Sequence, residues 1–375
     1  MWDLSSSLYI HVPFCASLCD YCDFYSIIPA SDDAVDAFLA AAVSDIKSQL
    51  EYFNVREILS VYVGGGTPSV LGKRIGVLLG ALKELSFPEI KEITVEANPE
   101  SATEEFLAAC REGGVTRLSV GAQTFHAPSR KAVNRIGNVD SLKKSLELCA
   151  GYFNGHLSVD LITGLPYQNE KTAIDDARCI LSLNPAHVSL YSLSLGKGTI
   201  LQKRVMEKDI VLPDADSSDA IWFAAKDALE NAGFKRYEVS NFALDGKKCQ
   251  HNLRYWRMEG WLGAGPSASG TVVDENRGTA KRFTYASDVY AYIKNPFINT
   301  AFLEELGKAD LIRESVFMGY RLREGPDEEI FKRRFNRDIK DCIPRSLERW
   351  KDRDKTLFLN SFLMDAFKEL DGIMF

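Results

Sequence analysis

The sequence has no apolar run long enough to cross a membrane as a helix. Nothing in its 375 residues approaches the roughly 20 consecutive apolar residues that a spanning helix needs. Residues 1–7 also lack the basic and apolar segments of a secretory signal. We therefore expect a cytoplasmic protein without a transmembrane segment.

An excess of positive charge is also missing. The chain has 45 Lys and Arg against 52 Asp and Glu, a net charge of −7. A broad nucleic-acid surface needs surplus Lys and Arg to neutralise phosphates, so we expect no nucleic-acid partner. There is no internal repeat or low-complexity tract, which leaves an ordinary globular composition.

The eight cysteines are mostly isolated, but Cys15, Cys19 and Cys22 fall within one short segment. In a reducing compartment such a group indicates a metal site rather than disulfides. Three thiolates at spacings of four and three suit a [4Fe–4S] cluster, in which each thiolate holds one iron and one iron stays open. A structural zinc site needs four ligands, and no fourth cysteine lies nearby. The spacing favours the cluster, and zinc remains the alternative.

The first half of the chain alternates short β-rich runs with helical patterns. Strands are predicted at residues 8–12, 58–63, 92–96, 116–120, 157–162 and 187–193. Helices are predicted between them at residues 33–53, 73–85, 103–111, 140–149 and 171–183. This order predicts an α/β fold with parallel βαβ units. The strands lack clean polar alternation, as expected when both faces are covered. Six units are too few for a full eight-stranded barrel, and periodicity leaves open whether the sheet closes.

Residues that could bind a ligand or take part in a reaction follow the ends of these strands. The cysteine segment follows the first strand, the run Gly64-Gly65-Gly66-Thr67 the second, and Glu96 ends the third. Gln123 and Asp160 come at the ends of the fourth and fifth strands. The carboxyl ends of parallel strands form the ligand-binding edge of α/β folds. We therefore expect one site at this edge.

Composition divides the chain into three segments. Residues 1–235 carry the alternating pattern, residues 236–300 are rich in aromatic residues, Gly and Asn, and residues 301–375 are charged and helix-rich. We expect a core domain, a linking region and a small C-terminal domain.

The cysteine spacing, with an aromatic beside the last cysteine, resembles the signature of radical S-adenosylmethionine (SAM) enzymes. Tyr9-Ile-His11-Val-Pro13-Phe14-Cys15 is similar to the entry strand of one branch, the oxygen-independent coproporphyrinogen III oxidases and the related HemW-type heme chaperones. The resemblance implies a partial (β/α)6 TIM-like barrel, a C-terminal winged-helix-like domain, and a [4Fe–4S] cluster that presents SAM to its open iron.

The resemblance also implies which residues contact SAM. They are Tyr9, Gly65, Gly66, Thr67, Glu96, Gln123, Arg135 and Asp160. The glycines let the backbone approach a ligand, and we expect free N–H groups there to bond a polar or anionic group. Each of these residues alone has a structural alternative, such as a cap, a turn or an ion pair.

Two features favour the chaperone branch over the oxidase. Phe24 stands where the oxidases have a further cysteine. Cys15 also lies closer to the start of the chain than the first cluster cysteine of the oxidases, which have a longer N-terminal arm. The element His251-Asn-x-x-Tyr255-Trp256 is similar to one associated with heme binding in HemW proteins. His251 is thus a candidate heme ligand, the alternative being a core histidine. The expected partners are heme or coproporphyrinogen III, and an unidentified heme acceptor.

Two positions depart from the family pattern. Gly137 stands where a histidine is usual, and Gly196 where a glutamate is usual. We expect the first to loosen a loop beside the nucleotide and the second to remove a carboxylate from the substrate side.

Overall fold

The computed structural model describes residues 5–85, 90–297 and 301–372. Six strands of its sheet run parallel, close to the predicted positions, and they confirm the α/β prediction. They are β1 (Ser5–Val12), β2 (Glu57–Gly65), β3 (Glu92–Ala97), β4 (Arg117–Gln123), β5 (Leu157–Thr163) and β6 (His187–Ser192).

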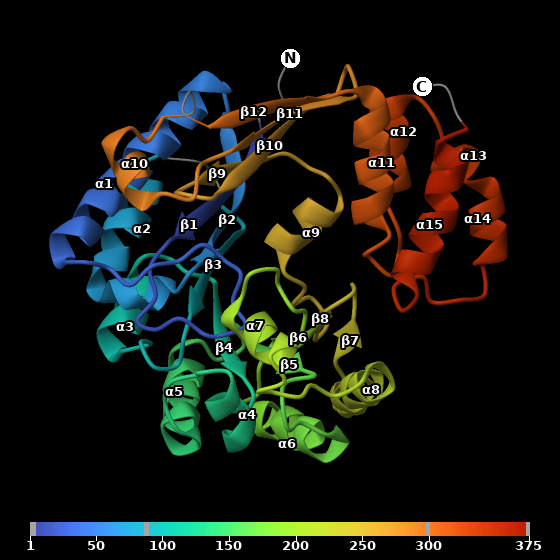
Figure 1. Cartoon of the computed structure of the whole chain (residues 1–375). Helices are drawn as coiled ribbons and strands as arrows, with labels where there is room; N and C mark the ends of the chain where they lie inside the picture. The colour runs from blue at the N-terminus through green and yellow to red at the C-terminus, as the bar shows by residue number, and fades with distance from the viewer. Residues whose placement is uncertain (1–4, 86–89, 298–300, 373–375) are drawn as a thin grey trace.

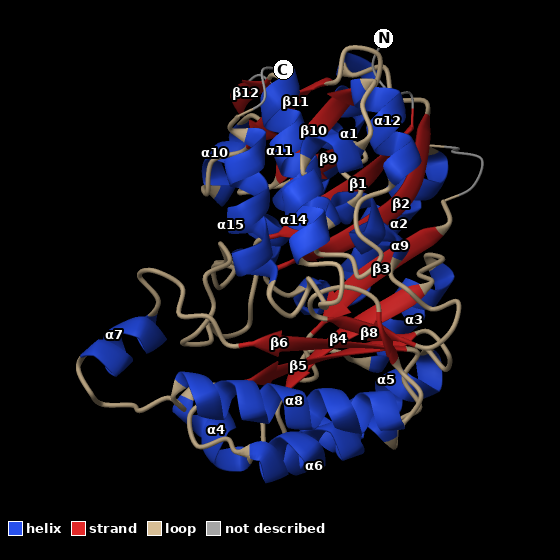
Figure 2. Ribbon diagram, turned by 90° about the vertical axis from the view of Figure 1, so that its right-hand side faces the viewer, coloured by secondary structure: helices blue, strands red, loops and turns tan. Residues whose placement is uncertain are grey.

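Helices follow these strands and cover the outer face of the sheet (Figure 1). They are α1 (Asp32–Tyr52), the short 3-10 helix η1 (Pro68–Arg74), α2 (Ile75–Glu84), α3 (Glu104–Glu112), α4 (Ala127–Ala132), α5 (Val139–Tyr152), α6 (Glu170–Leu181), α7 (Ile200–Met206) and α8 (Ala215–Asn231). Their apolar faces pack on strand residues such as Leu8, Ile10 and Val12 in one large core. Figure 2 shows α7 standing out from the layer of α4, α6 and α8.

The sheet is an open barrel, because β1 and β6 do not pair with each other. Its order is β12-β11-β10-β9-β1-β2-β3-β4-β5-β6-β8-β7. The later strands extend both edges, with β9 parallel to β1 and β8 antiparallel to β6. They are β7 (Lys235–Arg236), β8 (Asn241–Ala243), β9 (Trp261–Ala264), β10 (Ser269–Asp274), β11 (Thr279–Thr284) and β12 (Phe302–Leu306). The sheet therefore takes strands from all three compositional segments of the chain.

The inner face of the barrel is polar, although its strands are buried. Ser60 donates to Ser7 across β2 and β1, and Ser119 donates to Asp160 across β4 and β5. Apolar residues alternate with these and face the helices. The strands therefore do alternate, and the prediction that they lack polar alternation was wrong. Both faces are buried, but only the outer one is apolar.

The C-terminal helices build a second core against the extension of the sheet. They are α11 (Lys308–Gly319), α12 (Glu328–Phe335), α13 (Ile339–Cys342), α14 (Pro344–Arg349) and α15 (Leu359–Leu370). Val273 and Ala280 from β10 and β11 belong to this core. Two further helices, α9 (Gln250–Trp256) and α10 (Val289–Lys294), precede it. No helix in the described part of the chain is long and apolar enough to cross a membrane.

Candidate functional site

The three cysteines lie on the loop that leaves β1, and the base of this loop is fixed by backbone hydrogen bonds. The Cys15 N–H donates to Ile27 O at 2.9 Å, and the Ile27 N–H donates to Pro13 O at 2.8 Å. Phe14 is buried and packs edge-on against Phe38 of α1. The loop is therefore anchored in the core at its base, while its tip faces the open edge of the barrel.

His11 ties the far end of the loop back to β1. Its Nε2 lies 2.8 Å from Tyr25 O, and since a carbonyl oxygen only accepts, Nε2 donates. Nδ1 then accepts from the Tyr9 hydroxyl at 3.0 Å. Burial lowers the pKa of His11, which favours this neutral form. His11 was not among the predicted site residues, yet it positions the loop.

A cavity of about 430 Å³ opens at the carboxyl ends of the strands. Ten of the predicted residues line it: Cys15, Cys19, Cys22, Gly65, Gly66, Thr67, Glu96, Gln123, Arg135 and Asp160. Loops and strands separated by up to half the chain thus converge on one space, as the positions of these residues in the sequence indicate.

The glycines are required by close packing. A Cβ atom on Gly65 would lie 2.6 Å from the His11 ring, and φ is +105° there; on Gly66 it would lie 2.7 Å from Phe14 O. The N–H groups of Gly65, Gly66 and Thr67 donate to Glu96 Oε2, Val12 O and Phe14 O. The expectation that these N–H groups are free for a ligand is therefore wrong. They attach β2 to the cysteine loop and to β3.

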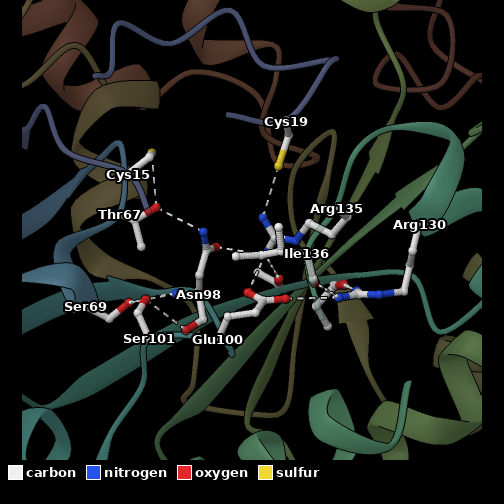
Figure 3. A network of polar contacts seen from close by, with 12 residues as sticks. Cys15, Cys19, Thr67, Ser69, Asn98, Glu100, Ser101, Arg130, Arg135 and Ile136 are labelled. Atoms are coloured by element: carbon white, nitrogen blue, oxygen red, sulfur yellow. Dashed lines mark hydrogen bonds and ion pairs between the residues drawn. The ribbon is translucent and has the colours of Figure 1, made fainter. Parts of the chain in front are cut away.

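A polar network joins two cysteines to the floor of the cavity (Figure 3). The Thr67 hydroxyl lies 3.2 Å from Cys15 Sγ and accepts from Asn98 Nδ2 at 2.9 Å. Asn98 Oδ1 accepts from Arg135 Nη2 at 2.8 Å, and Arg135 Nη1 lies 3.5 Å from Cys19 Sγ. Glu100 holds the same arginine at 3.8 Å. The guanidinium is thus placed beside a cysteine sulfur, where a thiolate would gain a cationic neighbour.

Sequence reasoning missed several members of this cavity and its network. They are Asn98, Glu100, Ser119, Arg130 and Tyr191. Asn98 and Glu100 lie just past the end of β3, two and four residues after Glu96. The expectation that site residues follow the ends of strands could therefore have identified them. Arg130 anchors Glu100 at 3.0 Å from α4, a helix that the periodicity did not predict.

The cavity carries two half-buried carboxylates. Burial raises the pKa of Glu96 to about 7 and that of Asp160 to about 6. Tyr62 donates to Glu96 Oε1 at 2.6 Å and Ser119 donates to Asp160, and these bonds offset part of the shift. A positively charged ligand would restore both to the ionised form.

Gln123 has an unusual backbone and an unpaired side-chain atom. It ends β4 at a break in the register with β5, with φ of +67°. Its Oε1 is buried and has no hydrogen-bond partner among the described residues. A strained residue that lines the cavity and has a buried oxygen without a partner indicates a place for a ligand's donor group.

Tyr9 and His251 do not line the cavity. Tyr9 lies deeper in the barrel, near the ring of Tyr62. His251 is fully buried on α9, and its Nδ1 is 2.9 Å from Ser60 Oγ. Because Ser60 donates to Ser7, its oxygen accepts from Nδ1, which leaves Nε2 to accept from Tyr255 at 3.0 Å.

No ring nitrogen of His251 is therefore free, and the prediction that it offers one to heme is wrong for this conformation. Its surroundings fit the alternative of a core histidine.

The two glycines that depart from the family pattern have local explanations. Gly137 adopts φ of +78° next to Glu100, a conformation that histidine rarely takes. A Cβ on Gly196 would lie 2.9 Å from the Cβ of Asp23 on the cysteine loop. Asp23 itself lines the cavity, so a carboxylate remains on this side.

Comparison with known proteins agrees with this site. The model of the radical SAM superfamily matches residues 9–180. The heme chaperone HemW of Lactococcus lactis is 33% identical over 88% of this chain and 85% of its own length. HemW of Escherichia coli is 35% identical over 71% of this chain and 70% of its own length. The chain belongs to the HemW family of radical SAM proteins.

A mitochondrial protein and a solved bacterial structure are also similar to this chain. The mitochondrial radical SAM domain-containing protein 1 of Mus musculus is 33% identical over 84% of this chain and 73% of its own length. The structure of coproporphyrinogen III oxidase (HemN) from Escherichia coli superposes with a TM-score of 0.78, covering 96% of this chain and 90% of that chain. At 21% identity, this likeness shows the shared fold.

Membership of the HemW family implies a [4Fe–4S] cluster and SAM, and the cavity fits both. No three His, Cys, Asp or Glu side chains in the described residues are grouped so that they could hold a single metal ion. A cluster instead takes one thiolate per iron, so Cys15, Cys19 and Cys22 can ligate it without converging on one atom. Bound there, the cluster would supply an electron for reductive chemistry on SAM. The carboxylates and Gln123 Oε1 suit the cationic and hydroxyl groups of SAM.

Proposed function

We propose that this chain is a heme-trafficking protein, which binds heme and passes it to an acceptor protein. The cluster, held by Cys15, Cys19 and Cys22, and SAM, held by the other cavity residues, would stabilise or gate the protein. The relatives in Lactococcus lactis and Escherichia coli, both named heme chaperone HemW, support this function. None of the eight cysteines forms a disulfide, which suits a reducing compartment, and we propose that the protein is cytoplasmic.

The charge of the cavity favours the function of a heme chaperone over that of an oxidase. The charged residues that line it are Asp23, Glu96, Asp160 and Arg135. Arg135 already donates to Gly121 O at 2.6 Å and to Asn98. Coproporphyrinogen III carries a propionate on every ring, and its binding calls for several free cations. An acidic cavity with one committed arginine favours cationic SAM and disfavours this substrate.

Phe24 supports the same choice. It lines the mouth of the cavity and is 65% exposed, so an apolar ring stands where a further thiol would be needed in the oxidase. Exposed Leu18 and Ile28 belong to the same loop. An apolar rim around an acidic interior suits contact with a flat macrocycle outside the cavity better than turnover of a polyanion inside it.

Anaerobic reconstitution tests the proposal. The loaded protein is given SAM, hemin and coproporphyrinogen III in parallel. We expect a Soret band of stoichiometrically bound heme, and no decarboxylation above the rate of the cluster-free protein. Release of carbon dioxide with formation of protoporphyrinogen IX would establish the oxidase instead. Absence of any saturable hemin binding would also overturn the proposal.

A further inference from the structure

The loop that carries the three cysteines has a second attachment, to α10. Its far end is Tyr25, whose carbonyl oxygen accepts from His11 of β1 at 2.8 Å. The Tyr25 hydroxyl accepts from the backbone N–H of Val289, the first residue of α10, at 3.0 Å. Tyr25 and Val289 are 264 residues apart in the chain, so only the tertiary fold brings them together. The loop is therefore fixed to β1 through one group of Tyr25 and to α10 through another.

Tyr292 fixes α10 to the core. Its side chain is buried, and its hydroxyl donates to Asp45 Oδ2 at 2.6 Å and accepts from the Gly265 N–H at 2.9 Å. Its ring packs 6.2 Å from that of Phe38, which itself packs on Phe14, the residue before the first cysteine of the loop. Helix α10 thus lies against α1 (Figure 1), and one tyrosine joins it to the base of the cysteine loop.

Asp45 of α1 is an unusual partner, because it is a fully buried carboxylate whose hydrogen bonds come from neutral groups. Tyr285 donates to Oδ1 and Tyr292 to Oδ2, both at 2.6 Å, and Gln49 Nε2 donates to Oδ1 at 2.9 Å. Burial raises the pKa of Asp45 to about 6, and these bonds offset part of the shift. A buried carboxylate is costly unless its oxygens are hydrogen-bonded. The two phenols are therefore held in place by charge-assisted bonds, which are stronger than bonds between neutral groups.

Gly265 connects Tyr292 with the other attachment of the loop. It follows β9, which pairs with β1, and it adopts φ of +108°. A Cβ atom there would overlap His11 O, so the position requires glycine. The N–H that Tyr292 holds thus belongs to a residue packed directly on the backbone of His11. The two ends of the cysteine loop, His11 and Tyr25, are both reached from Tyr292.

We propose that Tyr292 is a positioning residue for the iron–sulfur cluster. It acts through the α10 clamp, which consists of Tyr25, Asp45, Gly265, Val289 and Tyr292. A [4Fe–4S] cluster holds its three thiolates at fixed separations, so a loop that moves lets a thiolate leave its iron. The clamp limits this motion from the outer side of the loop and keeps the cluster in place. The inference concerns the cluster alone and does not rest on the proposed heme function.

Chelation of the iron by EDTA tests how firmly the reconstituted full chain holds its cluster, with the visible absorbance followed under anaerobic conditions. Tyr292→Phe should release the cluster about fivefold faster than the wild type, the factor that one hydrogen bond contributes. Tyr285→Phe is the matched control, because Tyr285 is equally buried and donates to the other Asp45 oxygen at the same distance, but precedes α10. This variant should lose a similar free energy of unfolding in urea and release the cluster at the wild-type rate.

The EPR spectrum of the reduced cluster gives a readout that a loss of stability alone would not move. Tyr292→Phe should broaden the signal, because the thiolates then take several arrangements, and Tyr285→Phe should not. Tyr25→Phe, which removes the hydroxyl that α10 holds, should release the cluster as fast as Tyr292→Phe, and the double variant no faster than either. Release from Tyr292→Phe at the wild-type rate, equal acceleration in Tyr285→Phe, or multiplied rates in the double variant would each overturn the proposed clamp.

Discussion

Replacing His251 by alanine should destabilise the protein without removing its cluster. The imidazole is fully buried, bonds to Ser60 and Tyr255, and packs between the rings of Tyr62 and Tyr255. Ser60 keeps its bond to Ser7, but the Tyr255 hydroxyl loses the partner that the structure gives it. An orphaned hydroxyl and the cavity left by the ring together suggest a loss of about 3–5 kcal/mol in the free energy of unfolding.

The acid dependence of stability gives a second readout. Burial lowers the pKa of His251 to about 3, below its ordinary value of 6.5. The neutral form therefore stabilises the fold fully above pH 6.5, and this contribution is lost as the pH falls from 6.5 toward 3. His251→Ala should lack this part of the acid slope.

Anaerobic urea unfolding at several pH values, followed by circular dichroism, measures both effects. His156→Ala is the control, because His156 is exposed and its removal should leave the stability unchanged. If His251→Ala abolished the Soret band at unchanged stability, the imidazole would be a heme ligand and its place in the barrel core would be wrong.

Three further outcomes are expected. Cys19→Ala should abolish the visible absorbance of the cluster while Cys110→Ala, in a buried helix position, should keep it; full iron and sulfide in the first variant would contradict the ligand set. SAM affinity, measured calorimetrically, should rise as the pH rises through 6–7 and then level off, because Glu96 with its raised pKa must ionise to face a cation; a flat profile, or the same slope in Glu96→Gln, would refute this. Gly65→Ala should prevent cluster assembly, since its Cβ meets the His11 ring at a φ of +105°, whereas Gly151→Ala faces open space and should assemble normally.

The sequence by itself determined the features that depend on local order. The cysteine spacing lies within one loop, and short β-rich runs between helical patterns mark the six strands regardless of what packs on them. Parallel strands place their carboxyl ends at one edge of a sheet. The positions of Glu96, Gln123 and Asp160 at strand ends therefore predicted that they line one cavity.

Only the tertiary structure decided which partners the polar side chains take. The imidazole of His251 meets Ser60, 191 residues away in the chain, and the N–H groups of the glycine run are taken by the cysteine loop and Glu96. No periodicity encodes such pairs, because each depends on how two separately formed elements meet. In the sequence, the polar residues of the strands looked like imperfect alternation. In the structure they form the inner face of the open barrel. There, burial raises the pKa of Glu96 and lowers that of His251, and thus sets which side chains are charged.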